Sequence, residues 1–216
     1  MNDRDLSLNG AVLTALPSGA LWWQAQDLLC VSDLHLGKAE RHARRGGSPL
    51  PPYEIRETLD RLRSDLDETG AQTVICLGDS FDDLQAAQAL PEDARQTILA
   101  LQSGRRWIWI EGNHDPGPLD IGGEHCGELP LGPLVFRHIA EPDGMGEISG
   151  HYHPKVTLGP QSRPAFLLDS RRLILPAYGT YTGGLRSTNK ALSGLMGPDA
   201  VAILTGKRPH RLPMPR

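Results

Sequence analysis

Four short polar strings, each at the end of a predicted strand, constrain this 216-residue chain more than any other feature. Together they offer two Asp, an Asn and at least three His, a donor set suited to two divalent metal ions. One histidine is left over for proton chemistry. Each string alone is compatible with an ordinary turn, but all four in one chain favour a metal centre. In chain order they are Asp33-Leu-His35, Gly78-Asp79, Gly112-Asn-His-Asp115 and Gly150-His-Tyr-His153.

The first half of the chain reads as alternating strands and helices. Apolar runs at Leu28–Ser32, Thr73–Leu77 and Trp107–Ile110 are typical of strands buried on both faces. Helical spacing of apolar residues predicts a helix at Tyr53–Glu68, and a second helix, with proline at its start, is predicted at Pro91–Gln102. A polar string follows each strand, at the end where α/β sheets place their sites.

Other segments differ from this alternation. A hairpin is predicted at Ala11–Trp23, and a polar loop at Lys38–Pro52, which contains glycine and proline pairs. The second half contains further short strands, at Leu134–His138, Glu147–Ser149, Ala165–Leu168, Leu173–Leu175 and Val201–Thr205. We therefore expect two sheets packed together with helices outside, in one domain spanning 1–216.

Bulk composition argues against several classes of protein. A net charge of −4 disfavours a protein that coats nucleic acid non-specifically. No apolar run approaches the length that spans a membrane. Three cysteines are an odd number, which favours a reduced compartment over a disulfide framework. We expect a cytoplasmic protein with no membrane partner.

The spacing within the strings suits metal ligation. Asp33 and His35 are separated by one residue, so both side chains can point the same way at a strand end. His151 and His153 repeat that arrangement. Asp79 follows a glycine, which lets the backbone turn sharply and the carboxylate face both ions. Two ions roughly 3.5–4 Å apart can clamp a phosphodiester and activate a water between them.

His114 has a separate role in this interpretation. Adjacent residues rarely bind one ion from an extended chain, so a metal-binding Asn113 leaves His114 free to protonate a leaving oxygen. We expect Asp115 to hold the His114 ring. A positioned acid of this kind is worth roughly 10²–10⁴ in rate.

The order DxH, GD, GNHD, a lone histidine and GHxH resembles the calcineurin-like metallophosphoesterases. The resemblance implies an α/β (α+β) fold, a four-layer αββα sandwich of two mixed β-sheets flanked by helices. It implies a metal-dependent hydrolase with Mn²⁺ as the first choice of cofactor and Mg²⁺, Fe²⁺ or Zn²⁺ as alternatives. His114 would be the general acid with Asp115 in support, and Asp82 would support the ligands or cap a helix. The implied ligands are Asp33, His35 and His153 for one ion, Asn113, His138 and His151 for the other, and Asp79 as the bridge.

Flanking strings resemble a bacterial endonuclease branch of that family. They are Ser32–Lys38, Arg45–Pro51, Ile148–Pro154 and Leu175–Gly184. This resemblance implies a two-metal-dependent phosphodiesterase or endonuclease that hydrolyses DNA, single-stranded or structured, in DNA repair. It also implies a DNA-repair ligase or helicase as a candidate partner.

Two further groups of residues have alternative interpretations. Lys38, Arg41, Arg44 and Arg45 follow the first ligands, so they either contact substrate phosphates or form a solvated face. The segment Thr180–Thr182 lies between glycines and either reaches a substrate or serves only as a turn.

Two rival functions stay open at this stage. The first is a phosphoesterase for a small nucleotide or phosphomonoester, since the chain has no large insertion to form a cap over the site. The second is a non-catalytic interaction module on the same fold. It is disfavoured because the implied ligands and the acid are all present.

Overall fold

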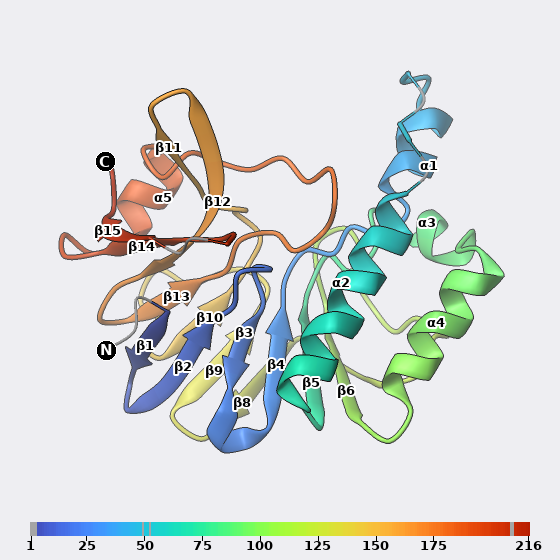
Figure 1. Ribbon diagram of the computed structural model, residues 1–216, viewed down its shortest axis with the longest axis horizontal. Helices are drawn as coiled ribbons and strands as arrows, with labels where there is room; N and C mark the ends of the chain where they lie inside the picture. Colours follow the sequence, from blue (N-terminus) through green and yellow to red (C-terminus); the bar gives the residue numbers. More distant parts are fainter. Residues whose placement is uncertain (1–3, 49, 52, 208–209) are drawn as a thin grey trace.

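The computed structural model describes residues 4–48, 50–51, 53–207 and 210–216. Two β-sheets pack face to face, and helices cover the outer face of each (Figure 1). This arrangement confirms the predicted sandwich of two mixed sheets. Pro49 and Pro52 of the predicted 38–52 loop lie outside the described residues.

The first sheet contains the strands that lead to three of the four polar strings. In spatial order its strands are β1 Asp5–Leu8, β2 Ala11–Ala15, β3 Leu21–Trp23, β4 Leu28–Val31, β5 Thr73–Leu77, β6 Arg106–Ile110 and β7 Glu124–Cys126. Strands β1 to β4 pair antiparallel, whereas β4 to β7 run parallel. The carboxyl ends of β4, β5 and β6 therefore share one edge of the sheet.

The second sheet is also mixed. Its spatial order is β15 His210–Pro213, β14 Val201–Leu204, β12 Gln161–Leu168, β13 Arg172–Ile174, β10 Glu147–Ser149, β9 Leu134–Arg137 and β8 Glu128–Leu131, with β11 Lys155–Leu158 paired to β12. Parallel pairing of β10 with both β9 and β13 brings the end of β9 beside the end of β10. The last two predicted ligand positions in the sequence, His138 and the string after Ser149, therefore lie side by side.

Alternation along the buried strands explains the layers. In β5, Ile75 and Leu77 pack into the core between the sheets, whereas Val74 and Cys76 pack under the helices. Trp107 and Trp109 of β6 also face the helices and are buried. A third core lies between the second sheet and the last helix. The central strands β5 and β6 thus bury both faces, which is why these runs are continuously apolar.

The helices include α2 and α4, which the sequence predicts, and four shorter ones that it does not. They are η1 Gln24–Gln26, α1 Lys38–Arg44, α2 Glu54–Thr69, α3 Leu84–Gln88, α4 Glu92–Gln102 and α5 Lys190–Leu195. The prediction of a loop across 38–52 is wrong for α1. None of the residues of α1 is buried, so the segment shows no apolar period to read. Residues with good helix propensity and an i, i+4 ion pair between Glu40 and Arg44 favour the helix instead.

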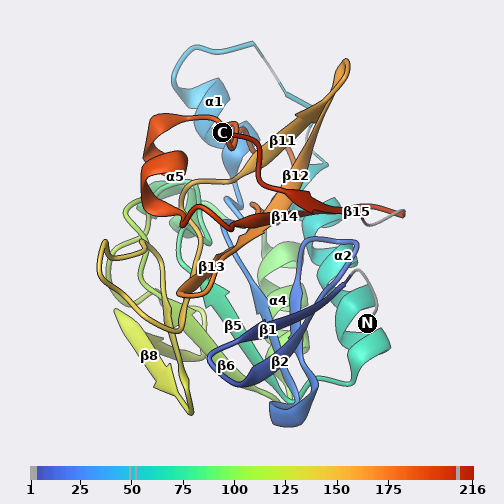
Figure 2. The same cartoon turned by 90° about the vertical axis from the view of Figure 1, so that its left-hand side faces the viewer.

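Two features project from the same end of the molecule. Helix α1 projects on one side and the β11–β12 hairpin on the other (Figures 1 and 2). The carboxyl ends of β4, β5 and β6 point toward this end (Figure 1). No described helix is both long and apolar enough to cross a membrane.

Candidate metal centre

Seven side chains from five loops meet where the carboxyl ends of strands from the two sheets come together. Three segments follow β4, β5 and β6 of the first sheet, and two follow β9 and β10 of the second. The residues are Asp33, His35, Asp79, Asn113, His138, His151 and His153, which are the seven predicted ligands. Residues up to 120 positions apart in the chain thus become neighbours because the sheet edges coincide.

One group of donors contains Asp33, His35 and His153. The Nε2 atom of His153 lies 2.9 Å from Asp33 Oδ1 and 3.3 Å from His35 Nε2. The Asp33 carboxylate is fully buried and accepts hydrogen bonds from the Ser32 hydroxyl and the His151 N–H. Burial raises the pKa of Asp33, but the hydrogen bond and charge of His153 outweigh it, so the net pKa is lowered.

The second group contains Asp79, Asn113, His138 and His151. The Nε2 atom of His138 lies 3.0 Å from Asn113 Oδ1, 3.3 Å from Asp79 Oδ2 and 3.3 Å from His151 Nδ1. Burial raises the pKa of Asp79, but the hydrogen bond and charge of His138 and the His114 N–H lower it to about 2. Asp79 is therefore ionised at neutral pH.

The chemistry of this second group fits a cation. His138 Nδ1 lies 3.0 Å from the Leu77 carbonyl oxygen, which can only accept, so Nδ1 carries the proton. Its Nε2 then presents a lone pair toward the Asn113 and Asp79 oxygens. Lone pairs that converge in this way repel one another unless a proton or a metal ion lies among them. The first group has the same character, because His35 Nδ1 faces Asp82 at 2.9 Å and leaves Nε2 to face His153.

Backbone conformation marks the same residues. Five of the seven have positive φ: Asp33 at 53°, His35 at 45°, Asp79 at 47°, His151 at 68° and His153 at 46°. L-residues adopt this region at a cost of order 1–3 kcal/mol each, and they persist there only when their surroundings impose it. The strain aims successive side chains into one space, which a relaxed strand end does not do.

Two glycines permit the close approach of the loops. A Cβ atom at Gly112 would lie 2.2 Å from the backbone nitrogen of Asp79, and one at Gly150 would lie 1.8 Å from the Ser32 hydroxyl oxygen. Any side chain at either position would push two ligand-bearing loops apart. The glycines of these two strings are therefore packing requirements of the centre.

His114 lies beside the two groups. Its Nδ1 lies 2.8 Å from the Asp82 carbonyl oxygen, so Nδ1 carries a proton and donates it there. Its Nε2 lies 4.0 Å from Asp79 Oδ2 and faces the centre. The side chain is partly exposed, so it can meet a substrate.

Asp115 does not hold the His114 ring as expected. Its buried carboxylate instead accepts backbone N–H groups that surround Asp79, from Asp79, Ser80, Phe81 and Gly112. Burial and the charge of Asp79 raise the pKa of Asp115 to about 6, against the lowering effect of these donors. Asp115 therefore fixes the turn that carries Asp79, and a backbone carbonyl orients His114.

Asp82 links the centre to α1. Its carboxylate lies 2.9 Å from His35 Nδ1, 2.8 Å from Arg41 and 3.5 Å from Lys38. Burial raises its pKa, but His35 and these two cations hold it well below its usual range. Of the two expected roles, supporting a ligand fits Asp82, whereas Asp83 caps α3 by accepting the Ala86 N–H.

The predicted phosphate-contact residues of α1 are mostly engaged with carboxylates. Arg44 pairs with Glu40 at 3.0 Å and with Asp83 at 2.8 Å, and Arg41 and Lys38 pair with Asp82. Arg45 is exposed and has no carboxylate within 4.0 Å in the described part of the chain. The sequence could not reveal these ion pairs, since Asp82 and Asp83 are about forty residues away.

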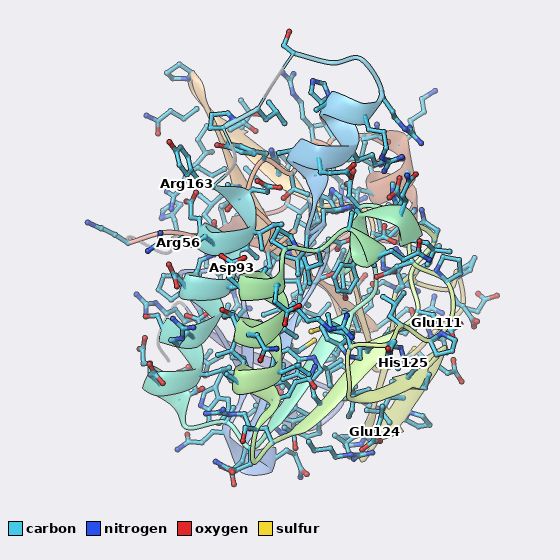
Figure 3. All side chains as sticks on the ribbon, turned by 90° about the vertical axis from the view of Figure 1, so that its right-hand side faces the viewer. Arg56, Asp93, Glu111, Glu124, His125 and Arg163 are labelled. Carbon is cyan, nitrogen blue, oxygen red and sulfur yellow. The ribbon has the colours of Figure 1, made fainter. Side chains whose placement is uncertain are left out.

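An open depression borders the second group. It encloses about 380 Å³ and is lined by Asn113 and His138 together with Glu111, Glu128 and Arg137. Glu111 lies on the face seen in Figure 3, beyond the end of β6. The centre is therefore reachable from solvent on this side.

A family model described as calcineurin-like phosphoesterase matches residues 27–175. The chain is similar to the crystal structure of Pseudomonas putida nuclease MPE, with 28% identity, a TM-score of 0.75, and coverage of 96% of this chain and 98% of that one. It also matches Yfce, a phosphoesterase from E. coli, with 12% identity, a TM-score of 0.43, and coverage of 87% and 99%. No curated protein matches the chain.

Proposed function

This chain belongs to the calcineurin-like phosphoesterase family, and we propose that it is a two-metal phosphodiesterase that cleaves DNA as an endonuclease. The observation that carries the proposal is the meeting of two adjacent donor groups, one of which contains Asp79, with the His114 ring beside Asp79. The family uses a dinuclear metal centre, and the protein is a metal-dependent hydrolase. The nucleic-acid substrate is supported by the similarity to a nuclease over nearly the full length of both chains.

The seven side chains have defined places in this proposal. Asp33, His35 and His153 would hold one ion, Asn113, His138 and His151 would hold the other, and Asp79 would be the shared ligand. Two divalent ions, when bound, supply Lewis-acid stabilisation of the phosphoryl group and an activated water. Mn²⁺ is our first choice, and Mg²⁺, Fe²⁺ or Zn²⁺ would fit the same oxygen and imidazole donors.

The protein's own residues supply orientation and a proton. Leu77 and Asp82 accept the Nδ1 protons of His138 and His114 through their carbonyl oxygens, which fixes both rings. His114, when doubly protonated, can donate its Nε2 proton to the departing oxygen as the phosphorus–oxygen bond breaks. Asp115 holds the turn that presents Asp79.

The finer identity is also a proposal. The flanking strings resemble PdeM, the bacterial ligase-associated DNA-damage-response endonuclease, so we place the protein in DNA repair with a ligase or helicase as a candidate partner. A cytoplasmic location fits its three unpaired cysteines. Contact of Lys38, Arg41, Arg44 and Arg45 with substrate phosphates stays a prediction, and the carboxylate partners of the first three argue for a weak contribution.

A phosphoesterase for small substrates is the rival function, because the open depression beside Asn113 admits small esters as readily as a polymer. The deciding experiment compares single-stranded DNA, bis-p-nitrophenyl phosphate and p-nitrophenyl phosphate under Mn²⁺, Mg²⁺ and Zn²⁺. We expect internal cleavage of DNA and hydrolysis of the diester. Turnover of the monoester alone, with DNA left intact, would overturn the nuclease proposal and support the rival.

A further inference from the structure

One loop spans the gap between the two ligand-bearing sides of the centre. We call residues 178–187, which connect β13 to α5, the tyrosine loop. In Figure 1 this orange segment leaves the second sheet, reaches toward α2 and returns to α5. Its first residues are bonded to the segment of Asp33, because the Tyr178 N–H donates to the Ser32 carbonyl at 2.7 Å and the Gly179 N–H to the Asp33 carbonyl at 3.1 Å.

Helix α2 anchors the first half of the tyrosine loop. Tyr178 is buried, and its hydroxyl donates to Asp65 at 2.8 Å. The guanidinium of Arg61 lies 4.6 Å from the centre of the Tyr178 ring. The Thr180 N–H donates to the Thr58 hydroxyl oxygen at 3.1 Å. The loop is therefore held rigidly up to Thr180.

The second half of the loop runs beside the GHxH string. The Leu185 N–H donates to the Tyr152 carbonyl at 3.2 Å, and the Lys155 N–H donates to the Leu185 carbonyl at 2.8 Å. A Cβ atom at Gly184 would lie 2.1 Å from the carbonyl oxygen of His153. The loop thus packs directly against a predicted metal ligand.

Tyr181 lies in the middle of this loop and has a strained backbone conformation. Its φ is 63°, and its side chain is 40% exposed. Positive φ in a bulky residue is a genuine outlier, and such outliers cluster at ligand-binding positions. The Tyr181 hydroxyl forms no hydrogen bond to any residue that the structure describes. Packing within the protein therefore does not account for a tyrosine at this place.

Two cations without acidic partners in the described ranges lie on the second half of the loop or against it. The Lys155 ammonium donates to the Thr182 carbonyl at 3.2 Å, so it contacts the residue after Tyr181. Arg186 pairs with Lys155 through a backbone bridge and is exposed. Across the described ranges, no carboxylate lies within 4.0 Å of either charged group. Their positive charge is uncompensated, unlike that of Arg41 and Arg44 on α1.

We propose that the tyrosine loop and Lys155 form the binding wall for single-stranded nucleic acid beside the metal centre. Lys155 and Arg186 contact backbone phosphates, and the Tyr181 ring stacks on an unpaired base. A positive groove with aromatic platforms is the general means of binding single strands without sequence preference. This inference rests on the proposed nuclease function and names the surface that would give it a polymer substrate.

The charge test uses fluorescence anisotropy of a labelled oligothymidylate in EDTA, so that no cleavage occurs. The variant Lys155→Gln/Arg186→Gln should bind about tenfold or more weakly, and its slope of log K against log salt should fall by about 1.4, or ~0.7 per phosphate contact on a single strand. The matched control is Arg63→Gln/Arg106→Gln, two exposed arginines paired with Asp60 and Glu124. It should bind like the wild type.

The stacking test uses three residues at position 181. Tyr181→Gly should not lower the melting temperature, because glycine adopts positive φ freely. It should weaken oligonucleotide binding by about 5- to 100-fold, the range for one lost base stack. Tyr181→Phe should bind like the wild type, because it keeps the ring. Tyr181→Leu should bind like the glycine variant.

The outcomes separate this proposal from the nuclease proposal. In the first case the wild-type protein binds the oligonucleotide, and either Lys155→Gln/Arg186→Gln keeps the same affinity and salt slope or Tyr181→Gly keeps the same affinity. Either result would overturn the binding wall and leave the nuclease proposal standing. Absence of oligonucleotide binding by the wild-type protein, with bis-p-nitrophenyl phosphate hydrolysis intact under Mn²⁺, would overturn both. Loss of diester hydrolysis in these variants would mean that the loop acts on the centre, which also contradicts a binding wall.

Discussion

Helix α1 and the tyrosine loop flank the same centre, but they connect to it by different means. From α1, Arg41 and Lys38 reach Asp82, whose carboxylate faces the ligand His35 and whose carbonyl accepts from His114. The tyrosine loop connects through backbone bonds, and neither its Arg186 nor the adjacent Lys155 of β11 pairs with a carboxylate in the described ranges. The α1 side is therefore tied to the chemistry of the centre, whereas the loop side is free to bind a polymer.

The difference shows that a run of basic residues in a sequence does not by itself mark the part of the surface with positive electrostatic potential. The charges of α1 are offset by Glu40, Asp82 and Asp83, and the last two are distant from α1 in the chain. Exposed pairs of this kind add little stability, but they do lower the field that a phosphate meets. Lys155 and Arg186 stand apart in sequence and still form the less compensated surface.

The largest effect is expected on the α1 side, at His114. His114→Ala should retain metal and lower turnover by about 10²–10⁴, most of all for esters with poor leaving groups, because the proton donor is lost. DNA affinity should change little. The measurement is kcat for a series of phosphodiesters that differ in leaving-group pKa, with His42→Ala on the exposed face of α1 as control. An equal loss on good and poor leaving groups would count against proton donation.

The next effect is expected at Asp82. Asp82→Ala should weaken metal binding by about 10–100-fold, because His35 loses the carboxylate that orients its ring and Arg41 keeps only its pair with Asp83. Isothermal titration calorimetry with Mn²⁺ measures the metal affinity. Asp83→Ala is the matched control, since it removes the α3 cap and a carboxylate partner of both Arg44 and Arg41 but touches no ligand. Its stability should fall by about 1 kcal/mol with metal affinity unchanged. Equal metal affinity in both variants would break the link between α1 and the centre.

The smallest effect is expected from the outer cations of α1. Arg44→Gln/Arg45→Gln should change oligonucleotide affinity by less than about threefold and the salt slope by less than one, because Arg44 is already paired and only Arg45 is uncompensated. Anisotropy at several salt concentrations measures both. A loss as large as that of Lys155→Gln/Arg186→Gln would restore the initial phosphate-contact interpretation of α1.

Much of the fold was predictable because its central strands are continuous apolar runs that are buried on both faces. The strand Thr73–Leu77 was placed to the residue, and those ending near Asp33 and Asn113 within one or two. The missed elements are short or exposed. Edge strands such as β7 and β15 bury little on either face, and α3 has five residues, too few for a period to emerge.

The candidate site likewise contains residues whose positions the sequence predicts and residues whose contacts form only in the folded chain. The sequence could bring Asp33, Asp79 and Asn113 together because parallel strand ends share an edge. It could not predict that Asp115 binds backbone amides, because those N–H groups converge only once the turn after Gly78 has formed. The Asp82 contacts and the strain at Tyr181 likewise depend on loops that meet only in the folded chain.

One measurement tests the account most directly: the ratio of kcat/KM for single-stranded DNA to kcat/KM for bis-p-nitrophenyl phosphate under Mn²⁺, in the wild type and two double variants. The ratio should fall about tenfold or more in Lys155→Gln/Arg186→Gln through KM for DNA, with diester hydrolysis unchanged. It should stay near the wild-type value in Arg44→Gln/Arg45→Gln. An unchanged ratio in the first variant, or an equal fall in both, would contradict the division of labour between the two flanks.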